Sequence, residues 1–303
     1  MNGEPALKEI VDALLEAQFP LIITAHSGRN PKTVPLLSEL SNLLAIGVFT
    51  SCPSAVCIPW THPHYIGTSF GGKNDLLDHA DLLILIDVDI PWVDTKGNKP
   101  RDDARVFVID SDPLKTTFQW SHVDADLLCK ADSEVALAQL VAAVSGPELQ
   151  SRAESKLSAR RARLQKVRTE WVTSQESAEQ VKSLTDGTTP TVPFVISSLR
   201  NIVAAQTPSH GENVLWVNEA ISNYPLAWAY LRPEQPGCVL QSGGSSLGYC
   251  LGASIGAYLG GIVADKKYDL ITAVVGDGSF LFGIPASAYW LARRYNTVSL
   301  QYT

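Results

Sequence analysis

Two glycine-rich stretches in the last third of the chain contain the residue types needed to hold a phosphorylated ligand. One is Gly243–Ala257 (GGSSLGYCLGASIGA), and the other, Ile271–Phe280 (ITAVVGDGSF), is an apolar run that ends in Gly276-Asp277-Gly278. Glycines let the main chain approach phosphate oxygens closely, and a helix that starts at such a turn points unpaired N–H groups at an anion. An aspartate at the carboxyl end of a strand supplies the hard oxygen ligand that Mg²⁺ prefers. The two stretches therefore predict a diphosphate site completed by a divalent metal.

The arrangement of these stretches narrows the prediction, since Gly-Asp-Gly alone is also the sequence of an ordinary turn. Here it ends a β-branched strand, follows a second glycine cluster, and precedes Phe280 and Phe282, which open a helical pattern. This combination closely resembles the diphosphate-binding domain of thiamine-diphosphate enzymes of the acetolactate synthase, benzoylformate decarboxylase and oxalyl-CoA decarboxylase group. The segment from Ser246 to Ala257 also matches a motif of that family, with Gly252 where the family usually has proline.

The resemblance implies a role for individual residues. Asp277 would be the first Mg²⁺ ligand, and Leu247 would be the apolar wedge that keeps the cofactor bent. The other residues implied to contact thiamine diphosphate are Ser222, Asn223, Gly244, Ser245, Ser246, Gly276, Gly278 and Ser279. For Ser222, capping of a helix is an equal alternative. No catalytic residue is assigned, because the family's activating glutamate belongs to a pyrimidine-binding domain without a counterpart in these residues.

The resemblance also implies a reaction and its partners. We expect a thiamine-diphosphate- and Mg²⁺-dependent decarboxylase or carboligase that is similar to acetolactate synthase, acts on a small 2-oxo acid, and forms a homo-oligomer in its full-length form. The family's second metal ligand would fall just after Thr303, where the sequence stops. A truncated, non-catalytic fragment or a pseudoenzyme is therefore the open alternative, and the isolated chain is expected to be inactive.

Alternating apolar strands and helices predict an α/β fold with two doubly wound parallel sheets. We expect residues 1–145 to form a Rossmann-like domain, 146–186 a helical linker, and 187–303 the diphosphate-binding domain, incomplete at its C-terminus. In the first domain, helices are expected at 7–17, 34–44 and 135–144, and strands at 20–24, 47–50, 82–88 and 105–110. By resemblance, this is the central domain of the family, which in relatives binds FAD, ADP or nothing.

The first domain has no G-x-G-x-x-G sequence, so nothing in it directly supports a dinucleotide. We expect an empty structural domain, with FAD as an unsupported alternative. His26, Gly28 and Arg29 follow a strand directly, where a ligand of such a sheet would bind. The sequence His62-Pro63-His64 resembles a pair of metal ligands, but the surrounding prolines and aromatic residues favour a packed loop.

Composition excludes several classes of protein. The chain has 303 residues, 45% hydrophobic and 18% charged, with a net charge of −7, which indicates a globular protein without a basic nucleic-acid surface. The basic run Arg160-Arg161-Ala162-Arg163 is predicted to be a solvated helix face. The uncharged segment Leu247–Ala264 favours a helix packed on a sheet over a membrane span. No signal or transit sequence is visible, so a cytoplasmic location is expected, with a mitochondrial one left open.

Overall fold

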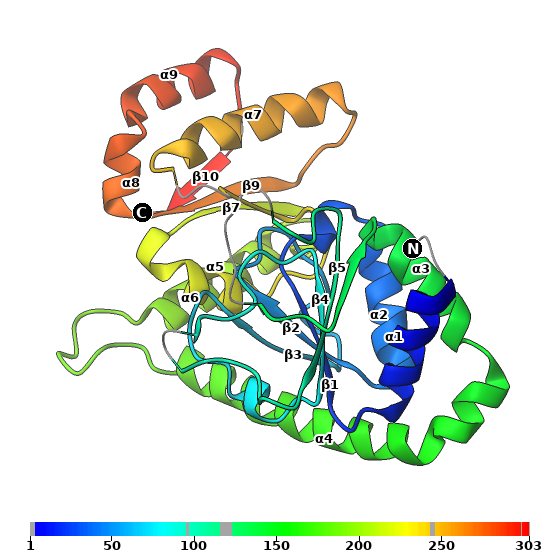
Figure 1. Cartoon of the computed structure of the whole chain (residues 1–303). Coiled ribbons are helices and arrows are strands. Elements are labelled where there is room, and N and C mark those ends of the chain that lie inside the picture. The colour runs from blue at the N-terminus through cyan, green and yellow to red at the C-terminus, as the bar shows by residue number, and fades with distance from the viewer. Residues whose placement is uncertain (1–3, 95–96, 116–122, 243–245, 298, 303) are drawn as a thin grey trace. The chain divides into compact units, whose positions relative to one another are not determined.

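The computed structural model describes residues 4–94, 97–115, 123–242, 246–297 and 299–302. The chain divides into two compact units, Met1–Val172 and Thr173–Thr303. Each unit is built on its own parallel sheet, and the two are described separately below (Figure 1).

The first unit alternates strands and helices along most of its length. Its helices are α1 (Glu4–Glu16), α2 (Thr33–Leu44), α3 (Ser133–Val144) and the first part of α4 (Pro147–Glu179), with short 3-10 turns η1 (Ser27–Arg29) and η2 (Asp75–Asp78). Its strands are β1 (Pro20–Thr24), β2 (Gly47–Ser51), β3 (Tyr65–Ser69), β4 (Leu82–Ile86), β5 (Arg105–Asp110) and β6 (Leu127–Lys130).

All strand pairs of the first sheet are parallel, in the order β3-β2-β1-β4-β5-β6. Every residue of β1 and β4 is buried, as expected of central parallel strands covered on both faces. The helices α1, α2 and α3 lie together on one side of the sheet (Figure 1). The chain runs outward in one direction from β1 and in the other from β4, so the strand order reverses between these two strands.

Helix α4 crosses the amino-terminal edge of this sheet and is fixed there by arginines. The Arg160 side chain is 2% exposed and donates hydrogen bonds to the carbonyl oxygens of Leu14, Ala17 and Leu44 at 2.5–2.8 Å. These carbonyls lie at or near the C-termini of α1 and α2, where main-chain oxygens lack partners within the helix. The guanidinium of Arg163 stacks on the ring of Phe19 at 4.0 Å. The predicted solvated basic face is therefore wrong at Arg160, because a lone buried guanidinium caps two helices at once.

The second unit has a smaller sheet. Its helices are the end of α4, α5 (Val192–Gln206), α6 (Tyr224–Leu231), α7 (Tyr249–Val263), α8 (Asp277–Phe282) and α9 (Pro285–Arg294), with the 3-10 turn η4 (Ile221–Asn223). Its strands are β7 (Val214–Glu219), β8 (Val239–Gln241), β9 (Leu270–Val275) and β10 (Ser299–Tyr302).

The second sheet is also parallel, in the order β10-β9-β7-β8. Its strand order reverses between β7 and β9, where Glu219 is paired with Val275 in the register. Helix α7 packs on these two strands through Cys250, Leu251 and Ile255. The glycines of α7 at positions 252, 256 and 260 do not face the sheet, since a Cβ added at any of them would meet no protein atom within 4 Å. No helix among the described residues is both long and apolar enough to cross a membrane.

The predicted fold class, two parallel α/β sheets, is confirmed by this architecture. The strands predicted at 20–24 and 105–110 have the observed bounds, while the strand predicted at 82–88 ends two residues earlier because Asp87 takes a left-handed conformation with φ 44°. Two strands of the first sheet were not predicted, β3 and β6. Both lie at the edges of the sheet, where shorter and more polar sequences suffice. The domain limits 1–145, 146–186 and 187–303 remain a prediction.

Candidate functional site

The carboxyl edge of the second sheet gathers three loops at the point where the strand order reverses. In open parallel sheets, this crevice is where ligands bind. Segment 219–223 leaves β7, segment 276–279 leaves β9, and the turn at 246–248 follows β8 and leads into α7. The amide of Gly276 donates to the carbonyl of Glu219 at 3.1 Å and so joins the first two loops directly.

The segment after β9 presents a carboxylate to solvent. Asp277 is exposed and is the first residue of α8, with Gly276 as its N-cap. Gly278 is exposed as well, whereas Ser279 is buried, with 4% of its surface exposed. The buried part of the turn is held by the amide of Phe280, which donates to the carbonyl of Gly276 at 2.8 Å. The Asp277 side chain is therefore carried on a short, internally bonded turn at the sheet edge.

The remaining predicted cofactor contacts lie on the other two loops. Ser222 is exposed within η4, and Asn223, half-buried, is the N-cap of α6 without a side-chain cap bond. The capping alternative for Ser222 is therefore wrong. Ser246 is exposed, and the side chain of Leu247 is 42% exposed. Gly244 and Ser245 lie outside the described residues.

Glu219 is the residue of this edge whose role sequence reasoning missed. Its side chain is fully buried, and its carboxylate accepts hydrogen bonds from the amides of Gly248 and Cys250, the latter at 2.7 Å. These amides belong to the N-terminus of α7. The expectation that the N–H groups of this helix point at an anionic ligand is therefore wrong for two of them, because an internal carboxylate already occupies that position.

The residues at this edge fit a diphosphate bound with a metal better than a metal alone. A Cβ added at Gly278 would meet no protein atom within 4 Å, and one at Gly276 would come no closer than 3.9 Å. Since neither residue needs a positive φ, neither packing nor backbone conformation requires glycine at these positions. The described residues contain no cluster of three or more histidine, cysteine, aspartate or glutamate side chains arranged to hold a metal. A single carboxylate suits Mg²⁺ when phosphate oxygens supply further ligands.

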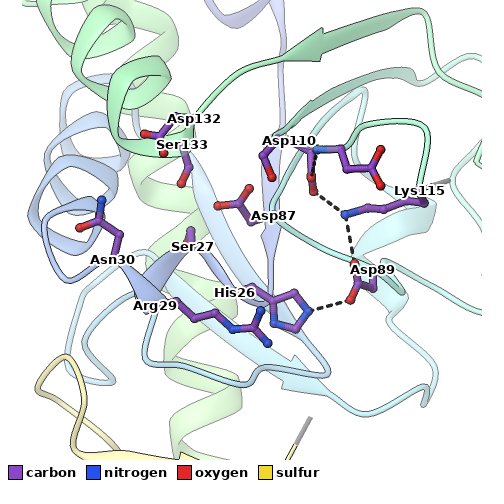
Figure 2. A pocket seen from close by; sticks show the side chains of 12 residues that line it. His26, Ser27, Arg29, Asn30, Asp87, Asp89, Asp110, Lys115, Asp132 and Ser133 are labelled. Carbon is purple, nitrogen blue, oxygen red and sulfur yellow. Dashed lines mark hydrogen bonds and ion pairs between the residues drawn. The ribbon is translucent and has the colours of Figure 1, made fainter. Parts of the chain in front are cut away.

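The first sheet has a pocket at the corresponding place, where its strand order reverses between β1 and β4. This pocket has a volume of about 510 Å³ and is lined by residues that follow β1, β4 and β5, together with the start of α3. Figure 2 shows its polar side chains facing one another across the opening. His26 Nε2 lies 3.0 Å from Asp89, and His26 Nδ1 lies 2.6 Å from the hydroxyl of Ser54.

Charges in this pocket are largely paired with each other. Lys115 Nζ lies 2.5 Å from Asp110 and 3.0 Å from Asp89 (Figure 2). The hydrogen bond with His26 and the one with Lys115 lower the pKa of Asp89, whereas burial raises the pKa of Asp87. For Lys115, burial acts to lower the pKa, but its hydrogen bonds with Asp110 and Asp89 outweigh that effect and raise it. The pocket therefore contains an internal ion-pair network and one carboxyl group, that of Asp87, that burial makes harder to ionise.

This pocket does not fit the pyrophosphate of FAD or ADP. Among its lining residues, five aspartates face one lysine and one arginine: Asp87, Asp89, Asp110, Asp112 and Asp132 against Lys115 and Arg29. Gly28, which could have served for close approach to a phosphate, is needed for packing, because a Cβ there would lie 1.9 Å from the carbonyl oxygen of Val56. The three positions singled out after β1 thus line or support the pocket, but its charge disfavours an anion.

His62 and His64 lie in a buried loop, each 8% exposed. His64 Nδ1 lies 3.0 Å from the carbonyl oxygen of Ser41, and burial lowers the pKa of His62 to about 4. The pair is packed within the first unit, as the surrounding prolines and aromatic residues predicted.

Comparison with known proteins supplies a family for the first unit. Residues 7–140 match the family model described as the central domain of thiamine pyrophosphate enzymes. No curated protein matches the chain in sequence.

Several solved structures share the fold along nearly the whole chain. An enzyme from Mycobacterium smegmatis, described as thiamin diphosphate-dependent, has a TM-score of 0.72 and 18% identity over 98% of this chain. A 4-hydroxybenzoylformate decarboxylase from Rhodococcus jostii has 0.68 and 19% over 99%, and a benzoylformate decarboxylase from Polynucleobacter necessarius has 0.71 and 17% over 98%. The chain spans about half of each of them, namely 52%, 51% and 50% of their lengths.

At these identities the structural matches establish the fold, and the family model shows what residues 7–140 are similar to. Residues 7–140 are thus similar to the central domain of thiamine pyrophosphate enzymes, and the chain as a whole shares the fold of the thiamine-diphosphate-dependent enzymes compared above.

Proposed function

We propose that this chain carries the diphosphate-binding side of a thiamine-diphosphate- and Mg²⁺-dependent enzyme that decarboxylates 2-oxo acids or transfers the resulting acyl unit. The observation that carries the proposal is the exposed Asp277 between two unconstrained glycines, at the point where the strand order of the second sheet reverses. Two proteins of the same fold are named as decarboxylases of benzoylformate and 4-hydroxybenzoylformate, which supports 2-oxo acids as the substrate class.

Each loop of the edge has a part in this proposal. Asp277 would hold Mg²⁺, while Gly276, Gly278 and Ser279 would receive the diphosphate. Ser222 and Asn223 would approach the diphosphate from the loop after β7. Leu247, 42% exposed, would support the bent ligand, with Ser246, Gly244 and Ser245 on its pyrimidine side.

Thiamine diphosphate, when bound, supplies an electron sink for cleavage of the carbon–carbon bond next to the carbonyl. The chain's own contribution is binding and orientation: a carboxylate for the metal, open main chain for the diphosphate, and an apolar side chain against the rings. Carboligation similar to that of acetolactate synthase and assembly into a homo-oligomer belong to the same proposal.

Calorimetric titration with thiamine diphosphate tests the binding step. We expect binding in the presence of Mg²⁺, none when EDTA replaces the metal, and only weak binding of Mg²⁺ alone. Equal affinity with and without Mg²⁺, or no binding in either condition, would contradict the proposal. Release of CO₂ from benzoylformate and pyruvate is then measured with a separately expressed pyrimidine-binding domain added, and binding without release in that mixture would favour the non-catalytic alternative.

A further inference from the structure

Glu219 is an acidic side chain buried entirely within the second unit, at the carboxyl end of β7. A buried carboxylate is costly unless hydrogen bonds satisfy its oxygens. Here each oxygen accepts one main-chain amide: Oε1 from Gly248 and Oε2 from Cys250, the latter at 2.7 Å. Both donors belong to the N-terminus of the 15-residue helix α7, where main-chain amides lack partners within the helix.

The main chain of Glu219 holds a second loop at the same time. Its carbonyl accepts the amide of Gly276 at 3.1 Å, one residue before Asp277. The side chain therefore holds the turn that contains Leu247, while the backbone of the same residue holds the turn that contains Asp277. These are the two residues that, in the proposed function, touch opposite ends of the ligand.

A contact between glycines couples the two turns from the other side. Gly248 has a left-handed φ of 86°, and a Cβ placed on it would lie 2.8 Å from the Cα of Gly283, directly after α8. Since α8 begins at Asp277, the Leu247 turn sits between Glu219 on one side and the α8 segment on the other. A change in the length or charge of the Glu219 side chain would move this turn relative to α8.

We propose that Glu219 is a positioning residue, which sets where Leu247 lies relative to Asp277 and thereby the fit of the bent ligand. This inference rests on the proposed function for the identity of the ligand. A plain helix cap would contribute stability only, whereas a positioning residue also determines ligand affinity and the local order of the turn.

The test compares Glu219→Gln with a matched control at the opposite edge of the same sheet. Glutamine keeps the size of the side chain but turns one acceptor into an NH₂ group that faces an amide donor. The control is Asp269→Asn, because the carboxylate of Asp269 likewise accepts a main-chain amide, that of Ser209 at 2.9 Å, just before β9. Both variants lose a carboxylate bonded to main chain, but only one of them adjoins the Leu247 turn.

Three quantities are measured on the full chain: urea stability, hydrogen exchange of the Gly248 and Cys250 amides, and affinity for thiamine diphosphate with Mg²⁺. In Glu219→Gln, we expect exchange at both amides to rise at least about tenfold beyond the change in global stability. Affinity should fall by about tenfold, which is the effect of losing a charged hydrogen bond. In Asp269→Asn, both quantities should stay at the wild-type value even if stability falls.

Loss of stability in Glu219→Gln with unchanged affinity and unchanged relative exchange would overturn the proposal and leave Glu219 as a cap. If the wild-type chain binds no thiamine diphosphate, the proposed function fails. The exchange rates and the NMR shifts of the Leu247 methyl groups then still decide whether Glu219 positions the turn, since a shift confined to Glu219→Gln supports positioning and identical spectra contradict it.

Discussion

The two sheets of this protein share one topological feature, a reversal of strand order, but carry different side chains at that point. In each sheet, the strand order reverses between two neighbouring strands, and a main-chain hydrogen bond joins the loops at that point: His26 to Asp87 at 2.9 Å in the first, and Gly276 to Glu219 at 3.1 Å in the second. At the first edge, acidic side chains surround the opening, and two of them, Asp89 and Asp110, are paired with Lys115 or His26. At the second edge, the buried carboxylate of Glu219 accepts hydrogen bonds from main-chain amides, and Asp277 is exposed.

This difference shows that the fold provides the place for a ligand and the side chains determine its charge. Both edges obey the rule that ligands of open parallel sheets bind at the reversal of strand order. Only the second edge combines an exposed metal-type ligand with glycines that no packing constraint explains. The comparison predicts that a diphosphate with its metal binds at the second edge and not at the first.

The largest expected effect is at Asp277. Asp277→Ala should reduce Mg²⁺-dependent affinity for thiamine diphosphate at least a thousandfold, about 4 kcal/mol, because the site loses its carboxylate ligand. The exposed position should leave thermal stability almost unchanged. Calorimetry measures the affinity, with Asp112→Ala at the first edge as the control. A Kd within about threefold of the wild-type value, roughly 0.7 kcal/mol, would show that the metal site is assigned to the wrong residue.

Substitutions at the first edge should change the stability of the protein and not its affinity for thiamine diphosphate. Lys115→Met leaves the carboxylates of Asp89 and Asp110 without their shared cation, and Asp110 is only 4% exposed. Removing one partner of such a pair should lower the free energy of unfolding by about 3 kcal/mol. The control is Lys99→Met, since the exposed pair with Asp102 should contribute less than about 1 kcal/mol. Similar urea midpoints for the two variants would argue against the ion-pair network.

Acidification should destabilise the two units to different extents. Burial holds the pKa of His62 at about 4, below its unfolded value, so the unfolded state takes up a proton first as the pH falls below about 6.5. Stability of the first unit should therefore decline between about pH 6.5 and pH 4, by about 2 kcal/mol at pH 5. The only histidine of residues 173–303, His210, is exposed. Urea unfolding from pH 7.5 to pH 5 measures the decline, and His62→Gln should flatten it; an unchanged slope in that variant would refute the assignment.

The smallest effect is expected at Leu247, whose side chain is 42% exposed. Leu247→Ala should weaken thiamine diphosphate binding about tenfold, near 1.4 kcal/mol, while the free energy of unfolding changes by less than about 1 kcal/mol. The matched control is Leu281→Ala, because Leu281 is exposed on the neighbouring α8. Equal affinity of the two variants would remove Leu247 from the site.

Sequence patterns predicted the buried centre of the fold well and its tertiary links poorly. The all-apolar runs of β1 and β4 have few alternatives to a buried strand, and the glycine pattern around Asp277 indicated the loop after β9. The partners of Arg160 and Glu219 could not be predicted, because each bonds main-chain atoms of segments distant in sequence. A signal for Glu219 existed: a single acidic residue two positions after the apolar run Val214–Val217. Its partner, however, depends on how α7 folds back onto β7.

Hydrogen exchange of the whole chain with and without thiamine diphosphate and Mg²⁺ tests the central claim, that the second edge and not the first binds the diphosphate. The account predicts slower exchange on binding for segments 219–223 and 276–279, and unchanged exchange for segments 26–30 and 110–115. Protection of the first edge, or binding that leaves 276–279 unprotected, would contradict it.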